Sequence, residues 1–252
     1  NGNLLARRAE VALARRDTAG ARSWSERALS IAPANLLYLE TRVMADLQRG
    51  DLEAARRESH RPGAVLDPAA YVSYLANYYD LGWVLDSAQD RLLLSLGADA
   101  YDGDSAAMGI VRAEQYHLHG DEANTRAAAK IAVEVFTRQL ETSPSDAQRH
   151  LFRGLSLAYL GRNAEAIQEG ERALAVQPSY RTNQAVGPYF DQILARIYMM
   201  AGQPDRAIDL LERNLQHPYA VTRAWLRIDP TFAPLRGNAR FQKLVASDAA
   251  IT

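Results

Sequence analysis

The stretch LFRGLSLAYLGRNAEAIQEGERALAVQP, residues 151–178, decides the fold. Apolar residues recur three and four positions apart on both sides of Gly161, which is typical of two amphipathic helices joined by a short turn. Pro178 cannot continue the second helix. Small residues stand where the two helices must approach closely, since a large side chain would overpack the contact. These residues are Gly154, Ala158, Ala166 and Ala173.

The turn at Gly161 is one member of a series along the chain. Its members lie 34, 32, 38, 41 and 41 residues apart, and each lies between two stretches with helical apolar spacing. They are Arg16-Asp17, Gly50-Asp51, Gly82, Gly120-Asp121, Gly161 and Gly202. A repeat of this length predicts stacked helical hairpins. We therefore expect an all-α fold, a right-handed superhelical solenoid of about six hairpins.

The expected hairpins divide the whole chain, 1–252, as one solenoid domain. Their approximate ranges are 2–35, 36–67, 68–101, 104–144, 146–178 and 186–217. A C-terminal cap over 219–247 is expected to cover the open end of the last hairpin, because a terminal repeat otherwise exposes a core face. Pro62-Gly63 shortens the second hairpin and suggests a hinge there.

Composition excludes several classes of protein. The 252 residues contain no cysteine, which rules out disulfides and thiolate metal sites. No apolar run approaches the ~18 residues of a membrane span, so we expect no direct membrane insertion. A net charge of −1 argues against a nucleic-acid surface. The chain begins at Asn1, so we expect a part of a larger or processed protein, with the compartment left open between cytoplasmic and extracytoplasmic.

The charge is unevenly distributed along the chain. Residues 1–61 carry 11 arginines against 8 acidic residues, residues 62–150 carry 6 basic against 13 acidic residues, and residues 151–252 carry 12 basic against 9 acidic residues. Ordinary solvated helix faces explain this pattern most simply. The alternative is an acidic middle that attracts a basic partner or the end of another copy, which would give a homo-oligomer or a filament.

Several hairpins resemble the tetratricopeptide repeat. The resemblance rests on Gly154, Ala158-Tyr159, Gly161, Ala166, Ala173 and Pro178, and on the similar segments GARSWSERALSIAP (20–33) and ARIYMMAGQPDRAI (195–208). It implies that the first helix of each hairpin lines a concave groove that binds a protein or peptide.

A narrower resemblance covers residues 75–245. The segments DLGWVLDSAQDRLLLSL, GLSLAYLGRNAEAIQEGERAL, LARIYMMAGQPDRAIDLLE and WLRIDPTFAPLRGNARFQKLV are similar to C-terminal tetratricopeptide arrays of bacterial multidomain signalling proteins. There the array follows a serine/threonine kinase, a nucleotide cyclase or a DNA-binding regulator domain. Ala239 stands where that group usually has proline. The resemblance implies a regulatory or sensory interaction array and carries over no catalytic residue.

The groove that this register implies supplies the candidate binding residues. They are Glu10, Glu40, Met44, Gln48, Tyr78, Glu114, His117, Tyr159, Tyr189, Gln192, Arg196 and Met199. The lysine and asparagine pairs with which chaperone-binding members hold a C-terminal carboxylate are missing, because Lys130 and Lys243 are the only lysines. We expect a peptide or helix as ligand. The alternative function is a self-assembling structural subunit.

No motif in the sequence predicts catalysis, a cofactor or a metal site. His117 and His119 are two residues apart on a helix, whereas a chelating pair needs a spacing of three or four. Asp102-Gly103-Asp104 lacks the later ligands of a calcium loop and is interpreted as a helix N-cap. Tyrosines and Trp83 in the third hairpin are interpreted as packing residues, with an aromatic ligand pocket as the alternative.

Overall fold

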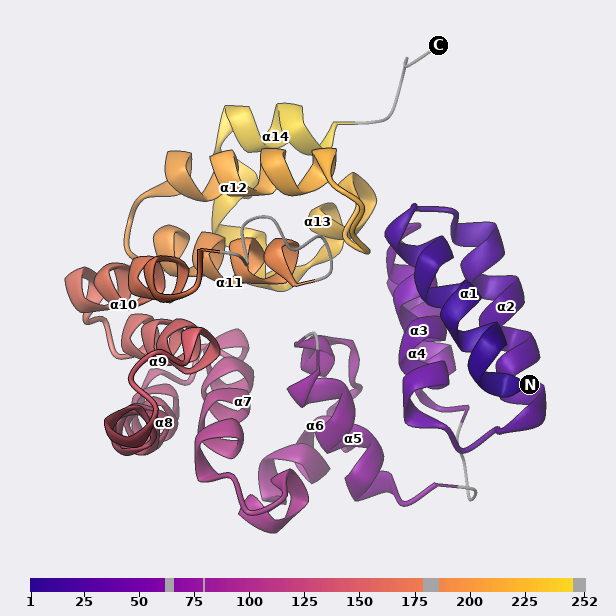
Figure 1. Ribbon diagram of the computed structural model, residues 1–252, viewed down its shortest axis with the longest axis horizontal. Coiled ribbons are helices and arrows are strands. Elements are labelled where there is room, and N and C mark those ends of the chain that lie inside the picture. The colour runs from indigo at the N-terminus through magenta and orange to yellow at the C-terminus, as the bar shows by residue number, and fades with distance from the viewer. Residues whose placement is uncertain (62–65, 79, 179–185, 247–252) are drawn as a thin grey trace. The chain divides into compact units, whose positions relative to one another are not determined.

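The fold of the chain is a series of helical hairpins (Figure 1). The computed structural model describes residues 1–61, 66–78, 80–178 and 186–246. These residues contain helices and no strand, so the predicted all-α repeat fold is confirmed. The proposed Pro62-Gly63 hinge, Tyr79 and position 247 of the expected cap lie outside the described residues.

Two compact units make up the chain. Unit 1 comprises Asn1–Leu93, Pro218–Phe232 and Arg236–Thr252, and unit 2 comprises Leu94–His217 and Ala233–Leu235. The expectation of one continuous solenoid over 1–252 stays a prediction.

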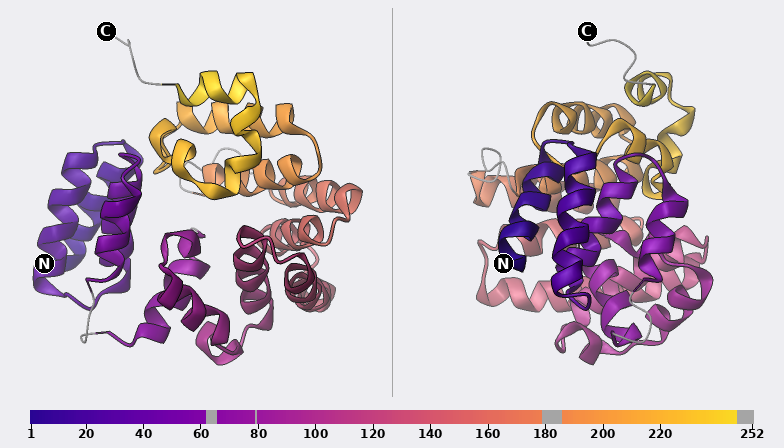
Figure 2. Two further views of the ribbon diagram at one scale, coloured as in Figure 1. Left: turned by 180° about the vertical axis from the view of Figure 1, so that it is seen from behind. Right: turned by 90° about the vertical axis from the view of Figure 1, so that its right-hand side faces the viewer.

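Unit 1 is built from both ends of the chain. Helices α1 to α4 form two hairpins that lie side by side (Figure 2). The helices are α1 (Gly2–Ala14), α2 (Thr18–Ile31), α3 (Leu36–Leu47), α4 (Leu52–Ser59), α5 (Pro68–Asn77), the 3₁₀ helix η2 (Leu81–Val84), α13 (Arg223–Ile228) and α14 (Ala239–Val245). Helix α6 (Ser87–Ser95) and the 3₁₀ helix η5 (Pro230–Gly237) pass from one unit into the other.

Unit 2 contains three helix pairs. Within it, α9 contacts α7, α8, α10 and α11. The helices are the 3₁₀ helix η3 (Ala98–Tyr101), α7 (Ser105–Leu118), α8 (Glu122–Thr142), α9 (Ala147–Tyr159), α10 (Asn163–Val176), α11 (Gly187–Met200) and α12 (Pro204–Gln216).

Local sequence signals explain where the helices begin and end. An Asp or Asn side chain caps most N-termini by accepting a hydrogen bond from a backbone N–H two or three residues on, as Asp17 does from Gly20 at 2.9 Å. Gly161 has a φ of 75°, the left-handed conformation that ends a helix and starts the next without a Cβ clash. Arg16 takes the same role in the first hairpin with a φ of 59°.

Two glycines of unit 2 allow close approach within a hairpin. A Cβ on Gly154 of α9 would lie 3.0 Å from the Ala166 oxygen and 3.0 Å from the Gly170 nitrogen of α10. A Cβ on Gly109 of α7 would meet the backbone of α8 at the same distances. The two hairpins therefore share one packing geometry, because only glycine leaves room for the facing backbone.

The segment after α12 bonds to the first two hairpins in unit 1. The Gln48 amide donates to the Leu13 oxygen at 2.7 Å and to the Ala220 oxygen at 2.8 Å. The Thr222 hydroxyl donates to the main-chain carbonyl oxygen of Gln48 at 2.8 Å. Gln48 thus links the first two hairpins to the segment that follows α12. The repeat pattern does not predict this long-range contact.

The aromatic residues of the third hairpin divide between core and surface. Tyr71 of α5 and Trp83 of η2 are buried, in agreement with the packing interpretation. Tyr78, directly after α5, is 50% exposed, and its ring lies 4.5 Å from that of Tyr74.

Candidate protein-binding surfaces

The predicted groove residues lie on the first helices of the hairpins or directly after them. In unit 1, Glu10 lies on α1, Glu40 and Met44 on α3, and Gln48 and Tyr78 at the C-caps of α3 and α5. In unit 2, the remaining seven lie on α7 (Glu114, His117), α9 (Tyr159) and α11 (Tyr189, Gln192, Arg196, Met199). Their contact with a partner stays a prediction.

Glu40 is a buried carboxylate at the contact of α3 with α5. One carboxylate oxygen accepts a hydrogen bond from the Tyr74 hydroxyl at 3.2 Å, and the other is buried with no hydrogen-bond partner among the described residues. Burial raises the pKa of Glu40 to about 8; the Tyr74 bond opposes the shift and the Glu10 charge adds to it. Glu40 is therefore largely protonated at neutral pH.

Gln48 and Met44 are buried, so they contribute to the interior of unit 1. The Gln48 amide already bonds two backbone oxygens. Glu10 and Tyr78 are the more accessible members of the predicted set in this unit, since Glu10 is only partly buried and Tyr78 is exposed.

One arginine joins the three first helices of unit 2. The Arg196 guanidinium on α11 lies 2.6 Å from the Glu114 carboxylate on α7 and donates to the Tyr159 hydroxyl on α9 at 2.7 Å. All three side chains are buried, as is Gln192. The ion pair therefore fixes the helices relative to one another instead of presenting a free charge.

Half-buried residues flank this ion pair. The His117 ring lies 5.3 Å from the Tyr159 ring, and burial lowers the pKa of His117, so the neutral imidazole is favoured. Tyr189 contacts Phe152 edge-on with ring centres 6.4 Å apart. Met199 is partly buried in the last turn of α11. These three side chains form the accessible part of the predicted groove in unit 2.

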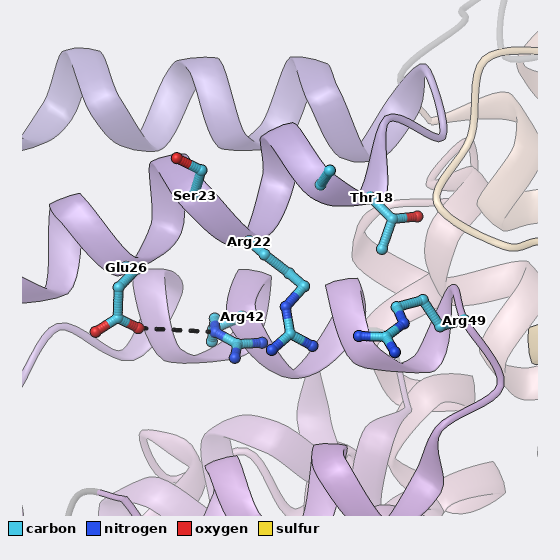
Figure 3. Close-up of a pocket in the computed structure, with 7 residues that line it drawn as sticks. Thr18, Arg22, Ser23, Glu26, Arg42 and Arg49 are labelled. Atoms are coloured by element: carbon cyan, nitrogen blue, oxygen red, sulfur yellow. Dashed lines mark ion pairs between the residues drawn. The ribbon is translucent and has the colours of Figure 1, made fainter.

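A pocket of about 760 Å³ lies between α2 and α3 in unit 1 (Figure 3). Three arginines and two hydroxyl-bearing residues dominate its lining. The lining residues are Thr18, Ala19, Arg22, Ser23, Glu26, Arg42 and Arg49. None of them belongs to the predicted set. The one available sequence signal is the excess of arginine over acidic residues within 1–61.

Acidic side chains pair with only some of the charge in this pocket. Arg22 and Arg42 both bond Asp46, which is fully buried behind them. Arg42 also lies 2.9 Å from Glu58. Arg49 is exposed, and no acidic group in the described part of the chain pairs with it.

Glu26, the carboxylate at the rim of the pocket, is held from outside. Arg61 bonds both of its oxygens, one of them at 2.6 Å. This hydrogen bond, followed by the charges of Arg61, Arg42 and Arg22, lowers the pKa of Glu26. Glu26 therefore stays ionised, and Arg61 already engages it.

A second pocket of about 320 Å³ lies among α10, α11 and α12 in unit 2. Its charges are matched in pairs: Arg206 lies 2.6 Å from Glu171, and Arg213 lies 2.5 Å from Asp191. The Arg206 guanidinium also stacks on the Tyr198 ring at 3.9 Å. These two arginines of the pocket are therefore both matched by carboxylates, unlike Arg49 in the pocket of unit 1.

Within the described ranges, no group of three His, Asp or Glu side chains is placed to hold a metal ion. His117 and His119 both lie at the end of α7, His119 as its C-cap. Among the described helices, none combines the length and apolar character that crossing a bilayer requires.

No known family model matches the chain, and no protein of curated function matches its sequence. A solved structure of MamA protein shares 13% identity with it at a TM-score of 0.30, covering 85% of this chain and 90% of that chain. The TPR2AB domain of yeast Sti1 in complex with pHSP90 shares 14% identity at a TM-score of 0.30, covering 92% of this chain and 97% of that chain. A structural similarity with a TM-score of 0.30 carries no argument about function. The function is therefore inferred from the surfaces of this chain.

Proposed function

We propose that this chain is a non-catalytic protein-interaction scaffold that binds a peptide or helix along the first helices of its hairpins. The observation that carries the proposal is the junction at Arg196, which joins α7, α9 and α11 through Glu114 and Tyr159. A surface that is already rigid loses little conformational entropy when a ligand binds. Half-buried His117, Tyr189 and Met199 beside it offer aromatic and apolar contacts.

The burial of Arg196 and Glu114 decides which residues are useful for a test. Reversing either charge would place two like charges 2.6 Å apart in the interior and destabilise unit 2. Met199 is a better choice because it is partly exposed near the end of α11. Ala175, exposed on the second helix α10, supplies a matched control.

A displayed peptide library selected on the purified chain tests the proposal. Selected peptides should bind Met199→Glu and Tyr189→Ala at least about fivefold more weakly than the unaltered chain, since each variant damages an interface contact. Ala175→Glu should bind them as the unaltered chain does. Failure to enrich any peptide would contradict the interaction function, and equal binding by all variants would contradict its placement on the first helices.

We further propose that the array is the regulatory or sensory part of a larger signalling protein. The similarity of residues 75–245 to C-terminal arrays of bacterial kinases, cyclases and regulators supports this context. Mass measurement of the intact protein in its source cells tests it. A mass large enough for a kinase, cyclase or DNA-binding domain on the same polypeptide supports the proposal. A polypeptide whose N-terminus lies close to Asn1 contradicts it.

Self-assembly is the second candidate function. The separation of charge between 1–61 and 62–150 favours it, because oppositely charged surfaces of two copies attract each other. Light scattering across protein and salt concentrations tests this alternative. Ordered oligomers that dissociate at high salt would support it, and a monomer under all conditions would exclude it.

A further inference from the structure

The pocket between α2 and α3 contains more positive charge than its carboxylates neutralise. Arg22, Arg42 and Arg49 line it, while Glu26 is the only acidic residue among the described lining residues. Asp46 lies behind the lining and bonds two of the arginines. Because Arg61 holds Glu26 and no described acidic group pairs with Arg49, the opening of the pocket carries excess positive charge.

Arg42 provides an independent sign of an incomplete site. Its side chain is only 7% exposed, and its Nε–H has no hydrogen-bond acceptor among the described residues. The nearest carboxylate oxygen, on Glu26, lies 3.8 Å away, beyond hydrogen-bond distance (Figure 3). A buried donor without an acceptor is costly, so a carboxylate oxygen that displaces the atoms covering this Nε would gain a charge-assisted hydrogen bond.

The dimensions of the site indicate an extended ligand. Arg42 and Arg49 are seven residues apart along α3 and its C-terminal end, which corresponds to about 10 Å along a helix axis. A volume of about 760 Å³ far exceeds that of one small anion. Thr18 and Ser23 on α2 add hydroxyl groups to the same lining. Several carboxylates in sequence fit this spread of charge better than one ion does.

We propose that the pocket between α2 and α3 is a docking site for an acidic segment of a partner protein, with its carboxylates on Arg49, Arg22 and the Nε–H of Arg42. This site is separate from the first-helix groove of unit 2. A partner can therefore use one surface without the other, and each can be tested alone.

Fluorescence anisotropy with a labelled hexaglutamate peptide tests the proposal on the full chain. Hexaglutamate should bind, and labelled hexaglutamine of equal length should not. Arg49→Gln should weaken hexaglutamate binding about fivefold or more, the scale of one accessible ion pair. Arg57→Gln removes an equal charge from an exposed position of α4 outside the pocket and should change binding less than twofold.

A second pair of variants tests the pocket by filling it with a carboxylate of the chain itself, without removing an arginine. Ser23→Glu places a resident carboxylate at the pocket lining and should weaken hexaglutamate binding, whereas Ser23→Gln adds similar bulk without charge and should retain it. Ser23 is exposed, so each variant should keep the helical circular dichroism of the unaltered chain. Peptides selected on the first-helix groove should still bind Arg49→Gln, which separates failure of this site from failure of the groove.

Four outcomes would overturn the proposal. Equal weakening by Arg49→Gln and Arg57→Gln would show nonspecific attraction to net charge. Unchanged binding by Arg49→Gln and Ser23→Glu would place the peptide elsewhere. Displacement of hexaglutamate by inorganic phosphate at equal concentration would assign the pocket to a small anion. Salt-sensitive self-association that Arg49→Gln abolishes would assign it to a second copy of this chain.

Discussion

Each unit holds a buried cluster of arginine and carboxylate, and the two clusters differ in their surroundings. In unit 1, Arg42 and Arg22 share Asp46 beside an open pocket. In unit 2, Arg196 is enclosed with Glu114 and Tyr159 and is 2% exposed. The same residue types therefore make a structural junction in one unit and the wall of a cavity in the other.

The difference is one of charge balance and free space. Glu114 and the Tyr159 hydroxyl both bond Arg196, and all three side chains are buried. In unit 1 a third arginine, Arg49, stands at the opening with no paired carboxylate among the described residues. A buried ion pair is by itself weak support for stability or function, so the variants below measure what each cluster does.

The largest effect is expected from breaking the enclosed cluster. Arg196→Met removes the guanidinium that lies 2.6 Å from the buried Glu114 carboxylate and should lower the free energy of unfolding by about 3–5 kcal/mol. Urea unfolding followed by circular dichroism measures this loss. The double variant Glu114→Leu with Arg196→Met removes both charges and should recover much of it. A loss below about 1 kcal/mol for the single variant would show that the junction does not hold the helices.

Glu40 extends the comparison to a buried carboxylate that has no arginine partner. Its pKa is about 8 in the folded chain and near 4.5 when exposed, so the folded state binds more protons between these values. Its contribution to stability is complete below pH 4.5 and is lost as the pH rises to 8. Glu40→Gln should remove this dependence, on the order of 3–5 kcal/mol, while keeping an acceptor for Tyr74.

Urea unfolding of both proteins between pH 4.5 and 9 checks this prediction. The variant should be more stable than the unaltered chain at pH 8 and above, with the difference shrinking toward pH 4.5. Parallel pH profiles for the two proteins would show that Glu40 is not the responsible group.

Breaking the open cluster of unit 1 should lower the free energy of unfolding less than breaking the enclosed cluster of unit 2. Asp46→Asn should cost about 1–3 kcal/mol, since it removes a buried charge whose two arginines keep other contacts or solvent. The same variant should strengthen hexaglutamate binding, because Arg22 and Arg42 then lack their resident carboxylate. A loss as large as that of Arg196→Met, or weaker hexaglutamate binding, would contradict the contrast between the clusters.

The smallest effect on stability is expected at the opening of the pocket. Arg49→Gln should change the free energy of unfolding by less than about 0.5 kcal/mol, because the side chain is exposed and unpaired within the described residues. Thermal unfolding checks this result alongside the anisotropy measurement. A clear loss of stability would mean that Arg49 has a structural role.

Much of the helical architecture could be predicted from local sequence. Gly161 ends a helix because its φ of 75° suits glycine, and Asp17 begins one because its carboxylate accepts from the Gly20 N–H. Gly154 indicated close helix contact, which is confirmed because a Cβ added there would lie only 3.0 Å from the facing backbone. These features depend on residues close in the chain or on one repeating contact.

The candidate sites could be predicted only in part. The repeat register named Arg196 and Glu114 as groove residues, yet 82 positions separate them and nothing local shows that they bond each other. Likewise, Gln48 lies in the expected position but bonds the Ala220 oxygen, 172 positions away. Because of such long-range pairing, polar residues that the repeat register predicts to be accessible are buried in the structure.

The sequence by itself determined the helices, their turns and the hairpin period, because hydrogen bonds and apolar spacing within about 40 residues define them. Only the tertiary structure decided which charges are neutralised. Arg196 and Arg49 are alike as residues, but packing encloses one against Glu114 and leaves the other at the opening of a pocket. Electrostatic energy depends on distance and burial in three dimensions, and neither can be read from residue order.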